Sequence, residues 1–237
     1  MPQAQALSDN DLVKYVIQLI TDGTPEEWNK HYRTKEFQKI LGEKAKDALC
    51  MDFDYKDRKV LYQCVNDRFI RKAPIDYCEF GVASGVSFKE WMKLNPDPNS
   101  RFFGFDSFHG LPEDWKDGAP EGAYSQGGKI PQVDDERATF IDGLFQDTVE
   151  SFAREFAPKN RLVLHMDADL YSSTLFCLMN FNPHIQKGTI ILFDELTARN
   201  FTDEFAALQD YCTACYRDYK IIAMRNDYVK LAIEITK

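Results

Sequence analysis

The sequence predicts an α/β protein with a doubly wound, mostly parallel sheet of seven strands, one antiparallel edge strand and a helical region at the N-terminus. Two observations carry this prediction. From Pro74 onwards, short apolar runs alternate with helical segments at the spacing of βαβ units. The runs RLVLHMD and GTIILFD show no alternation of apolar and polar residues, which is typical of parallel strands covered by helices on both faces.

Helical patterns dominate the N-terminal part of the chain. Apolar residues recur at helical spacing between Ser8, which can cap a helix, and Gly23, which can stop one. The segment TPEEW then supplies Thr24 as the cap of a further helix. Two more helices are predicted at about 34–47 and 56–71, since VLYQCVNDRFI repeats its apolar positions every three or four residues.

The strands are short apolar runs bounded by turn-forming or acidic residues. They are predicted at 75–80, 101–106, 138–142, 161–167, 188–194, 219–225 and 228–235. The last two are separated by little more than RND, which is too short for a crossover connection, so they are expected to pair antiparallel. The pattern indicates a Rossmann-like α/β domain at 74–237, preceded by a helical cap at 1–73.

Length and charge restrict the class of partner. The 237 residues suit one α/β domain with an appendage. The chain has 38 acidic and 29 basic residues, and this acidic balance argues against a basic surface that binds nucleic acid or an anionic membrane. No apolar run approaches the roughly 20 residues that span a bilayer, and the N-terminus lacks the pattern of a signal peptide. We expect a cytoplasmic protein with a small-molecule partner, and a homo-oligomer remains an open alternative.

Acidic residues end several of the predicted strands. In a parallel sheet, ligands bind beyond the carboxyl ends of the strands. The acids at these ends are Glu79, Asp106, Asp167, Asp169, Asp194 and Glu195. So many carboxylates at one edge indicate a bound cation, a ribose or a proton-transfer role, because their repulsion and desolvation must be offset. The alternative is that some of them only cap the following helices.

A glycine loop follows the first of these acids. Gly81 allows a sharp turn after the strand, Gly85 allows close approach of a ligand, and the helix that begins near Val86 directs its amide-rich end at that ligand. The loop lacks the middle and final glycines of G-x-G-x-x-G, which argues against a nicotinamide dinucleotide. Glu79 suits a ligand with an amino group, and Asp106 stands where a ribose diol is usually bound.

Five segments, in order from 79 to 195, resemble a known family. They are EFGVASGVSFKEW, FFGFDSFHGLPEDW, DGLFQDTV, LHMDADLYSST and GTIILFDE. They resemble class I S-adenosylmethionine-dependent methyltransferases, and within these the macrocin O-methyltransferase-like group. The resemblance implies that S-adenosylmethionine lies against the glycine loop, with the strand-two acid on its ribose. The cofactor-binding positions that it implies are Glu79, Gly81, Gly85, Ser87, Asp106, Ser107, Asp142 and Gly143.

The same resemblance implies a divalent cation, usually Mg²⁺, held by Asp167, Asp194 and Glu195. Mg²⁺ prefers a few carboxylates with water or substrate oxygens, and a bound metal lowers the pKa of an attached hydroxyl. Asp167 is thus a catalytic candidate through the metal, and Asp169 and His165 are candidate bases. His165 has a second interpretation, as a hydrogen-bonded strand residue.

Residues 111–137 form a long segment rich in Gly, Pro and charge without a helical or strand period. Such connections are often lids or binding loops, and the alternative is a disordered surface insertion. A lid would bring Trp115 and Tyr124 into contact with the ligand.

The function expected from these features is metal-assisted transfer of a methyl group from S-adenosylmethionine to a hydroxyl of a small metabolite, such as a sugar or a polyketide-derived or phenolic compound. Two alternatives remain open. One is a metal-independent N- or C-methyltransferase, and the other is a non-catalytic subunit that binds S-adenosylmethionine.

Overall fold

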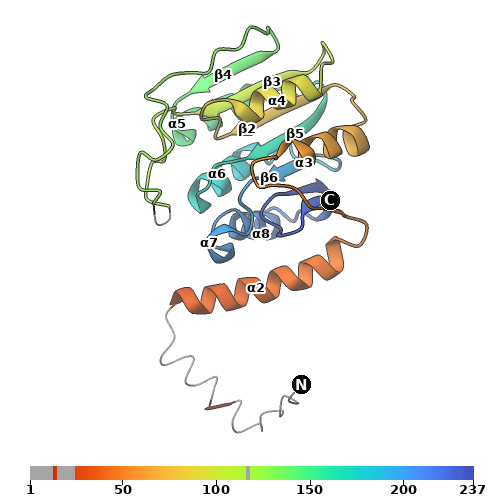
Figure 1. The fold of residues 1–237 in the computed structure, drawn as a ribbon, viewed down its shortest axis with the longest axis vertical. Helices are drawn as coiled ribbons and strands as arrows, with labels where there is room; N and C mark the ends of the chain where they lie inside the picture. Colours follow the sequence, from red (N-terminus) through yellow and green to blue (C-terminus); the bar gives the residue numbers. More distant parts are fainter. Residues whose placement is uncertain (1–12, 15–24, 116–117) are drawn as a thin grey trace.

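The computed structural model describes residues 13–14, 25–115 and 118–237. One eight-stranded sheet runs through the described part of the chain, with helices on both faces (Figure 1). The helix expected between Ser8 and Gly23 lies outside the described residues apart from Val13 and Lys14, which are helical. The predicted α/β, doubly wound class is confirmed.

The strands are β1 (Leu49–Met51), β2 (Ile75–Phe80), β3 (Arg101–Asp106), β4 (Ala138–Asp142), β5 (Arg161–Met166), β6 (Ile190–Phe193), β7 (Tyr219–Arg225) and β8 (Leu231–Ile235). Their order in the sheet is β1-β7-β8-β6-β5-β2-β3-β4. All neighbouring pairs are parallel except those of β8, which is antiparallel to β6 and to β7. Six strands therefore keep the direction of β1, and β8 alone is reversed.

Two details of the predicted sheet need correction. The sheet has eight strands rather than seven, because the three-residue β1 lies within the front that was expected to be wholly helical and pairs with β7. The reversed strand is present as predicted, but it lies between β7 and β6, and the two edge strands are β1 and β4. The reason is that β7 lies one strand away from β6, and β8 then turns back into the position between them.

The helices are α2 (Pro25–Lys44), α3 (Lys59–Cys64), the π-helix η1 (Val65–Ile70), α4 (Val86–Leu94), α5 (Phe145–Glu155), α6 (Tyr171–Phe181), α7 (Ala198–Phe201) and α8 (Glu204–Ala214). The two helices expected from Thr24 and at 34–47 form one helix, α2, since no Gly or Pro interrupts the segment between them. The helix expected at 56–71 is divided into α3 and η1, and η1 ends at the left-handed Arg71.

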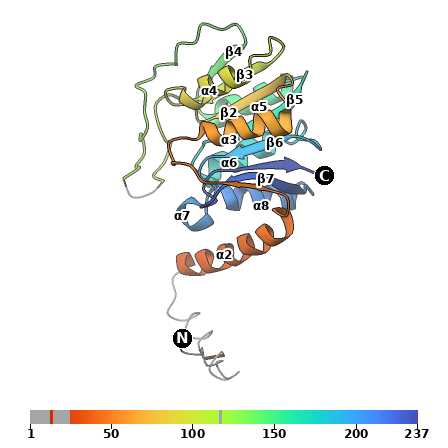
Figure 2. The ribbon, with the colours of Figure 1, turned by 45° about the vertical axis from the view of Figure 1, so that its right-hand side comes forward.

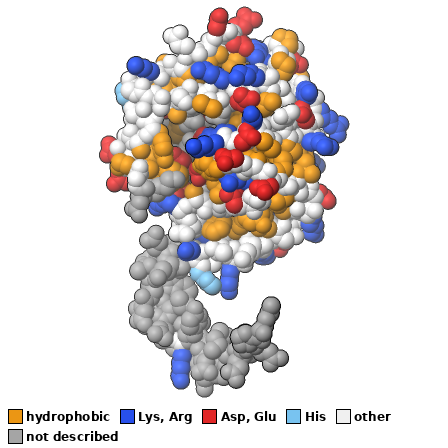
Figure 3. Space-filling view, in the orientation of Figure 1, with side chains coloured by type: hydrophobic (Ala, Val, Ile, Leu, Met, Phe, Trp, Pro, Cys, Tyr) orange, Lys and Arg blue, Asp and Glu red, His pale blue; other side chains and the backbone are white. Residues whose placement is uncertain are grey.

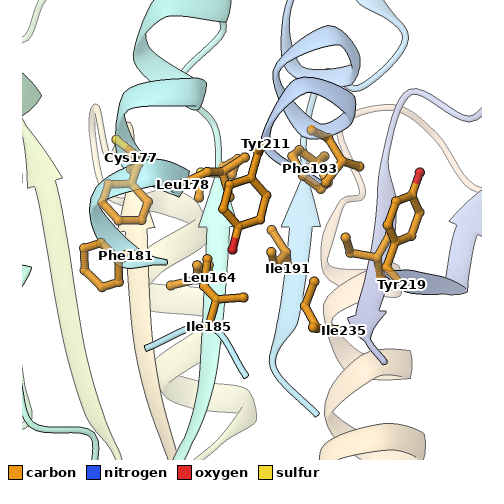
Figure 4. Packing of buried hydrophobic residues seen from close by; sticks show 14 of the residues in the cluster. Leu164, Cys177, Leu178, Phe181, Ile185, Ile191, Phe193, Tyr211, Tyr219 and Ile235 are labelled. Atoms are coloured by element: carbon orange, nitrogen blue, oxygen red, sulfur yellow. The ribbon is translucent and has the colours of Figure 1, made fainter. Parts of the chain in front are cut away.

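Two apolar clusters hold the helices to the sheet. On one face, α5, α6 and α8 pack over β5, β6 and their neighbours, with Leu178 and Tyr211 above Leu164 and Ile191 (Figure 4). The other face is covered by α3, η1 and α4, whose buried side chains include Tyr62 and Trp91. Burial of each apolar side chain contributes on the order of 1.5–3 kcal/mol, so these clusters supply most of the stabilisation of the fold.

Helix α2 lies at the end of the molecule that carries β7 and α8, where it contacts α7 (Figure 2). Its Phe37 ring packs against Phe205 of α8 at a centroid separation of 5.3 Å. In the part of the chain that the structure describes, no helix has the length and apolar content needed to cross a membrane. Basic and acidic side chains are interspersed on the face shown in Figure 3.

Candidate active site

A cavity of about 430 Å³ opens beyond the carboxyl ends of the parallel strands. Loops after β1, β2, β3, β4, β5 and β6 line it, because these strands point the same way. Its wall includes residues 55–56, 58, 81–84, 86–87, 106–107, 110–112, 143–146, 167–169 and 194–195. A cavity of this size at this edge of an α/β sheet is the usual place for a small ligand.

The glycine loop after β2 is held in a conformation that requires glycine. Gly81 has φ +92°, and a Cβ at this position would lie 1.9 Å from the carbonyl oxygen of Asp167. Gly85 has φ +77° and caps α4. The backbone of this loop therefore packs directly against the residue that follows β5, with no room for a side chain at Gly81.

Asp106 at the end of β3 organises the same loop. Its carboxylate accepts backbone N–H bonds from Val82 at 2.8 Å, from Ala83 at 2.7 Å and from Phe108 at 2.7 Å. Two carboxylate oxygens offer about four acceptor sites, so one site remains for a ligand hydroxyl. Asp106 and Ser107, which the resemblance implies as cofactor-binding positions, both line the cavity.

Glu79 lies behind the cavity wall rather than in it. Its side chain is fully buried, and it accepts hydrogen bonds from the Ser87 hydroxyl, at 2.6 Å, and from the Tyr77 hydroxyl. Ser87 itself lines the cavity. Glu79 thus orients Ser87 and the start of α4, and any contact that it makes with a ligand runs through Ser87.

His165 belongs to the same buried network. Its Nδ1 lies 2.7 Å from the Tyr77 hydroxyl, which donates to Glu79 and therefore accepts from the ring. The other nitrogen, Nε2, lies 3.5 Å from the Tyr62 hydroxyl and 4.0 Å from Asp194. The ring is fully buried and does not line the cavity, which fits the interpretation of His165 as a hydrogen-bonded strand residue.

Asp167 and Asp194, which follow β5 and β6, share one arginine. Nη1 of Arg58 lies 2.9 Å from Asp167 Oδ2 and 3.2 Å from Asp194 Oδ2. The buried Lys230 adds a second cation, with its Nζ 2.7 Å from Asp194 Oδ2. Burial and the neighbouring Asp194 carboxylate raise the pKa of Asp167. Burial opposes ionisation of Asp194, yet Arg58 and Lys230 hold its pKa below the usual value.

Glu195, the third predicted metal ligand, lies in the cavity wall but apart from this pair. Its carboxylate accepts a hydrogen bond from the Tyr55 hydroxyl, and its backbone N–H donates to Glu204 at 3.0 Å. Burial raises the pKa of Glu195. Among the described residues, the side chains whose ligand atoms lie within 4.8 Å of one another are His165, Asp167 and Asp194. The structure thus brings two of the three predicted metal ligands together.

Asp169 lines the cavity beside these acids. Its φ of 58° is unusual for a residue other than glycine and places its side chain in a tightly constrained turn after β5. Tyr124 lines the cavity from the 111–137 segment. Its pKa is raised mainly by burial and also by the negative charges of Asp169 and Asp167. Asp169 and Tyr124 therefore share one end of the cavity.

The 111–137 segment is held at several points, and its buried aromatic contact is Trp115. Trp115 is buried, donates its Nε1–H to Asp203 at 3.0 Å and accepts a hydrogen bond from Arg199 at its carbonyl oxygen. Trp115 packs in a small apolar cluster with Ala119 and Leu170. Both Trp115 and Tyr124 line the cavity, where a lid was expected to bring them.

Gly143, Asp142 and Gly85 are the remaining predicted cofactor positions. Of these, Gly143 lines the cavity, and its N–H donates to the carbonyl of Asp106 at 3.0 Å. The Asp142 side chain is exposed and is absent from the cavity wall, as is Gly85.

Sequence reasoning missed Tyr55, Arg58, Tyr77 and Lys230. Lys230 directly precedes the mostly apolar strand LAIEI, and a charge next to a buried strand can indicate a buried ion pair. Tyr77 lies two residues before Glu79 on one strand and so shares its face. Nothing in DYKDRK distinguishes Tyr55 or Arg58 from surface residues.

Residues 78–196, half of the chain, match the family described as "Methyltransferase domain", and the chain belongs to this family. The chain is 27% identical over 173 residues to demethyldecarbamoylnovobiocin O-methyltransferase of Streptomyces niveus, a match that covers 62% of this chain and 64% of that protein. It is 26% identical over 175 residues to 8-demethyl-8-(2,3-dimethoxy-α-L-rhamnosyl)-tetracenomycin-C 4′-O-methyltransferase of Streptomyces olivaceus, covering 64% and 63%. The matches thus span somewhat less than two thirds of these relatives.

Solved structures with the same fold include two methyltransferases. The calicheamicin methyltransferase CalS11 superposes with a TM-score of 0.59 at 19% identity, covering 98% of this chain and 94% of that one. The O-methyltransferase NovP superposes with a TM-score of 0.55 at 22% identity, covering 77% and 80%. The fold of this protein is therefore that of class I methyltransferases.

Proposed function

We propose that the protein is an S-adenosylmethionine-dependent O-methyltransferase that acts, with a divalent cation, on a hydroxyl of a small glycosylated or sugar-like metabolite. The observation that carries the proposal is one cavity lined both by the glycine loop with Asp106 and by the carboxylates of Asp167, Asp169, Asp194 and Glu195. We assign the first group to the cofactor end of the cavity and the second to the acceptor end. The two named relatives are O-methyltransferases, and the name of one places its reaction on a rhamnosyl-bearing compound.

The donor set fits a hard divalent cation. Two carboxylates from adjacent strands approach each other here, and a positively charged group, the Arg58 guanidinium, already bridges them. Asp167 and Asp194, with Glu195 beside them, would hold the cation, which would supply Lewis-acid polarisation of the acceptor oxygen. The proposed magnesium set is thus compatible with the side chains present.

S-adenosylmethionine supplies a methyl group that is already activated as a sulfonium. The task of the protein is then to align the acceptor and to take its proton. We assign the proton to a carboxylate oxygen of Asp169, because this acid lines the cavity whereas His165 does not. The Asp106-supported loop and Ser107 would orient the ribose, and Trp115 and Tyr124 would exclude water above the acceptor.

Methyl transfer with and without chelator tests the proposal. The purified protein, S-adenosylmethionine labelled in its methyl group and a panel of rhamnosides, other hydroxylated sugars, polyketides and phenols should give labelled ether products. EDTA should stop the transfer and Mg²⁺ should restore it. Equal formation of ether products in EDTA would contradict the assistance by a metal and leave the O-methyltransferase assignment standing. Methylation only at nitrogen or carbon would contradict the O-methyltransferase assignment.

Asp106→Asn should weaken binding of S-adenosylhomocysteine by roughly ten- to a hundredfold, the equivalent of about 1.5–3 kcal/mol. The single oxygen of the Asn amide cannot accept three backbone N–H bonds and a ribose hydroxyl. The loop at Val82 and Ala83 therefore loses part of the hydrogen bonding that Asp106 provides. Calorimetric titration measures the change. Asp97→Asn is the control, since Asp97 also accepts a backbone N–H two residues on but lies outside the cavity wall. Unchanged affinity in Asp106→Asn would remove Asp106 from the cofactor site.

Residues 118–136 should exchange their amide hydrogens more slowly when S-adenosylhomocysteine is bound. This part of the segment lacks helices and strands, and its few apolar contacts are those of Ala119 and Ala123 beside Trp115 and of Val133 against the core. Hydrogen exchange with mass spectrometry, with and without the ligand, measures the difference. Equal and strong protection in both states would rule out a lid.

A further inference from the structure

Arg58 occupies the position between the two carboxylates at which a cation would be bound. It is the last residue of the loop formed by residues 52–58, which connects β1 to α3. A single nitrogen, Nη1, contacts Oδ2 of Asp167 at 2.9 Å and Oδ2 of Asp194 at 3.2 Å. Arg58 thus bridges the two carboxylates, and Asp194 Oδ2 also contacts the buried Lys230 Nζ at 2.7 Å.

We propose that Arg58 is the built-in counter-cation of this site, and that a divalent cation binds by displacing it. The inference rests on the metal-assisted function proposed above. Mg²⁺ would need Asp167 Oδ2, which Arg58 Nη1 contacts at 2.9 Å, and a divalent cation on that oxygen would strongly repel a guanidinium on the same atom. The Arg58 side chain is 27% exposed, so it has a path into solvent.

Lys230 cannot be displaced in the same way. It is fully buried, contacts both Oδ2 and the carbonyl oxygen of Asp194, and lies 4.1 Å from the centre of the Tyr55 ring. Its charge therefore remains in place and compensates Asp194 in both states. Of the two cations beside Asp194, Arg58 is therefore the one that a bound metal would displace.

The 52–58 loop would respond to the exchange. Tyr55, three residues before Arg58, donates its hydroxyl hydrogen to Glu195, the remaining proposed metal ligand. If Glu195 turned toward the metal while Arg58 left, the loop would lose both of its hydrogen-bonded contacts with the acids. Metal occupancy would then control how tightly this loop covers the acceptor end of the cavity.

Calorimetry with Mg²⁺, supported by Mn²⁺ binding measured by electron paramagnetic resonance, tests the inference without an activity readout. Arg58→Gln should bind the metal about tenfold more tightly than the wild type, because nothing has to be displaced. Arg58→Lys, which keeps the charge but loses the planar guanidinium, should lie between them. The control, Lys59→Gln, removes the same charge from the next residue. Because Lys59 is paired with Asp57, this variant should bind the metal within about twofold of the wild-type affinity.

The outcomes separate this inference from the function on which it rests. Equal metal affinity in the wild type and Arg58→Gln, or weaker affinity in the variant, would overturn the displacement while leaving the metal site intact. An equal gain in metal affinity in Lys59→Gln would show that the effect comes from net charge alone, and would also overturn the displacement of Arg58. Binding of neither metal to any variant would remove the metal from the proposed function and this inference with it. In support, addition of Mg²⁺ should speed amide exchange at 52–58 in the wild type only.

Discussion

Replacing Asp167 with Asn should lower turnover by roughly 100-fold or more while changing affinity for S-adenosylhomocysteine by less than about threefold. Asn keeps the size of the side chain but removes the negative charge that a divalent cation requires. The cofactor end of the cavity, at Gly81 and Asp106, is built from other strands. Steady-state kinetics and calorimetric titration measure the two quantities separately.

Asp167 is a better choice for this test than Asp194. Asp194 is the partner of the fully buried Lys230, and breaking a buried ion pair costs about 3–5 kcal/mol, so Asp194→Asn would lose stability as well as charge. Asp67→Asn, on η1 with an exposed pair to Lys72, is the matched control and should behave as the wild type. Normal turnover of Asp167→Asn in chelator-treated buffer would show that the metal assignment is wrong.

Gly81→Ala should destabilise the protein by about 3 kcal/mol or more, or abolish cofactor binding if the loop rearranges instead. Two effects add here. The φ of +92° is strained for any residue with a Cβ, and the new methyl group would meet the Asp167 carbonyl oxygen at 1.9 Å. Relief of that overlap requires β2 and the end of β5 to separate.

Gly188→Ala isolates the first of these effects. Gly188 has φ +95°, almost the same as Gly81, but a Cβ there meets no atom within 4 Å. It should cost only about 1–2 kcal/mol from backbone strain. Urea denaturation of both variants gives the difference. Equal free energies of unfolding would contradict the close approach between the glycine loop and β5.

Much of the sheet could be predicted because the relevant signals are local. Each of β2 to β8 is an apolar run with its own boundary residues, and the turn between Arg225 and Leu231 is too short for anything but a reversal. The short β1 carries no such signal, since Leu49 and Cys50 are exposed and its pairing with β7 is long-range. The place of β8 between β7 and β6 also depends on where β7 packs, which a turn length cannot reveal.

The acids of the site follow from the same topology, whereas their cations do not. Parallel strands bring Asp106, Asp167 and Asp194 to one edge, so their position relative to the sheet could be predicted. Arg58 contacts Asp167 across 109 residues, and its loop has no motif that indicates this. The burial of Glu79 and His165 behind the wall is set by Tyr77, whose hydroxyl joins them. Their residue types and their positions on the strands predict that Glu79 and His165 lie near the site, but side-chain packing decides which residues reach the cavity.

The cavity beyond β2 and β3 is expected to bind S-adenosylmethionine. Calorimetric titration of the wild-type protein with S-adenosylhomocysteine, and separately with NAD⁺, measures this binding. We predict saturable one-site binding of S-adenosylhomocysteine and no heat of binding with NAD⁺, because the loop has Gly81 and Gly85 but not the dinucleotide pattern. Binding of NAD⁺ with no binding of S-adenosylhomocysteine would show that the cavity is not a site for S-adenosylmethionine.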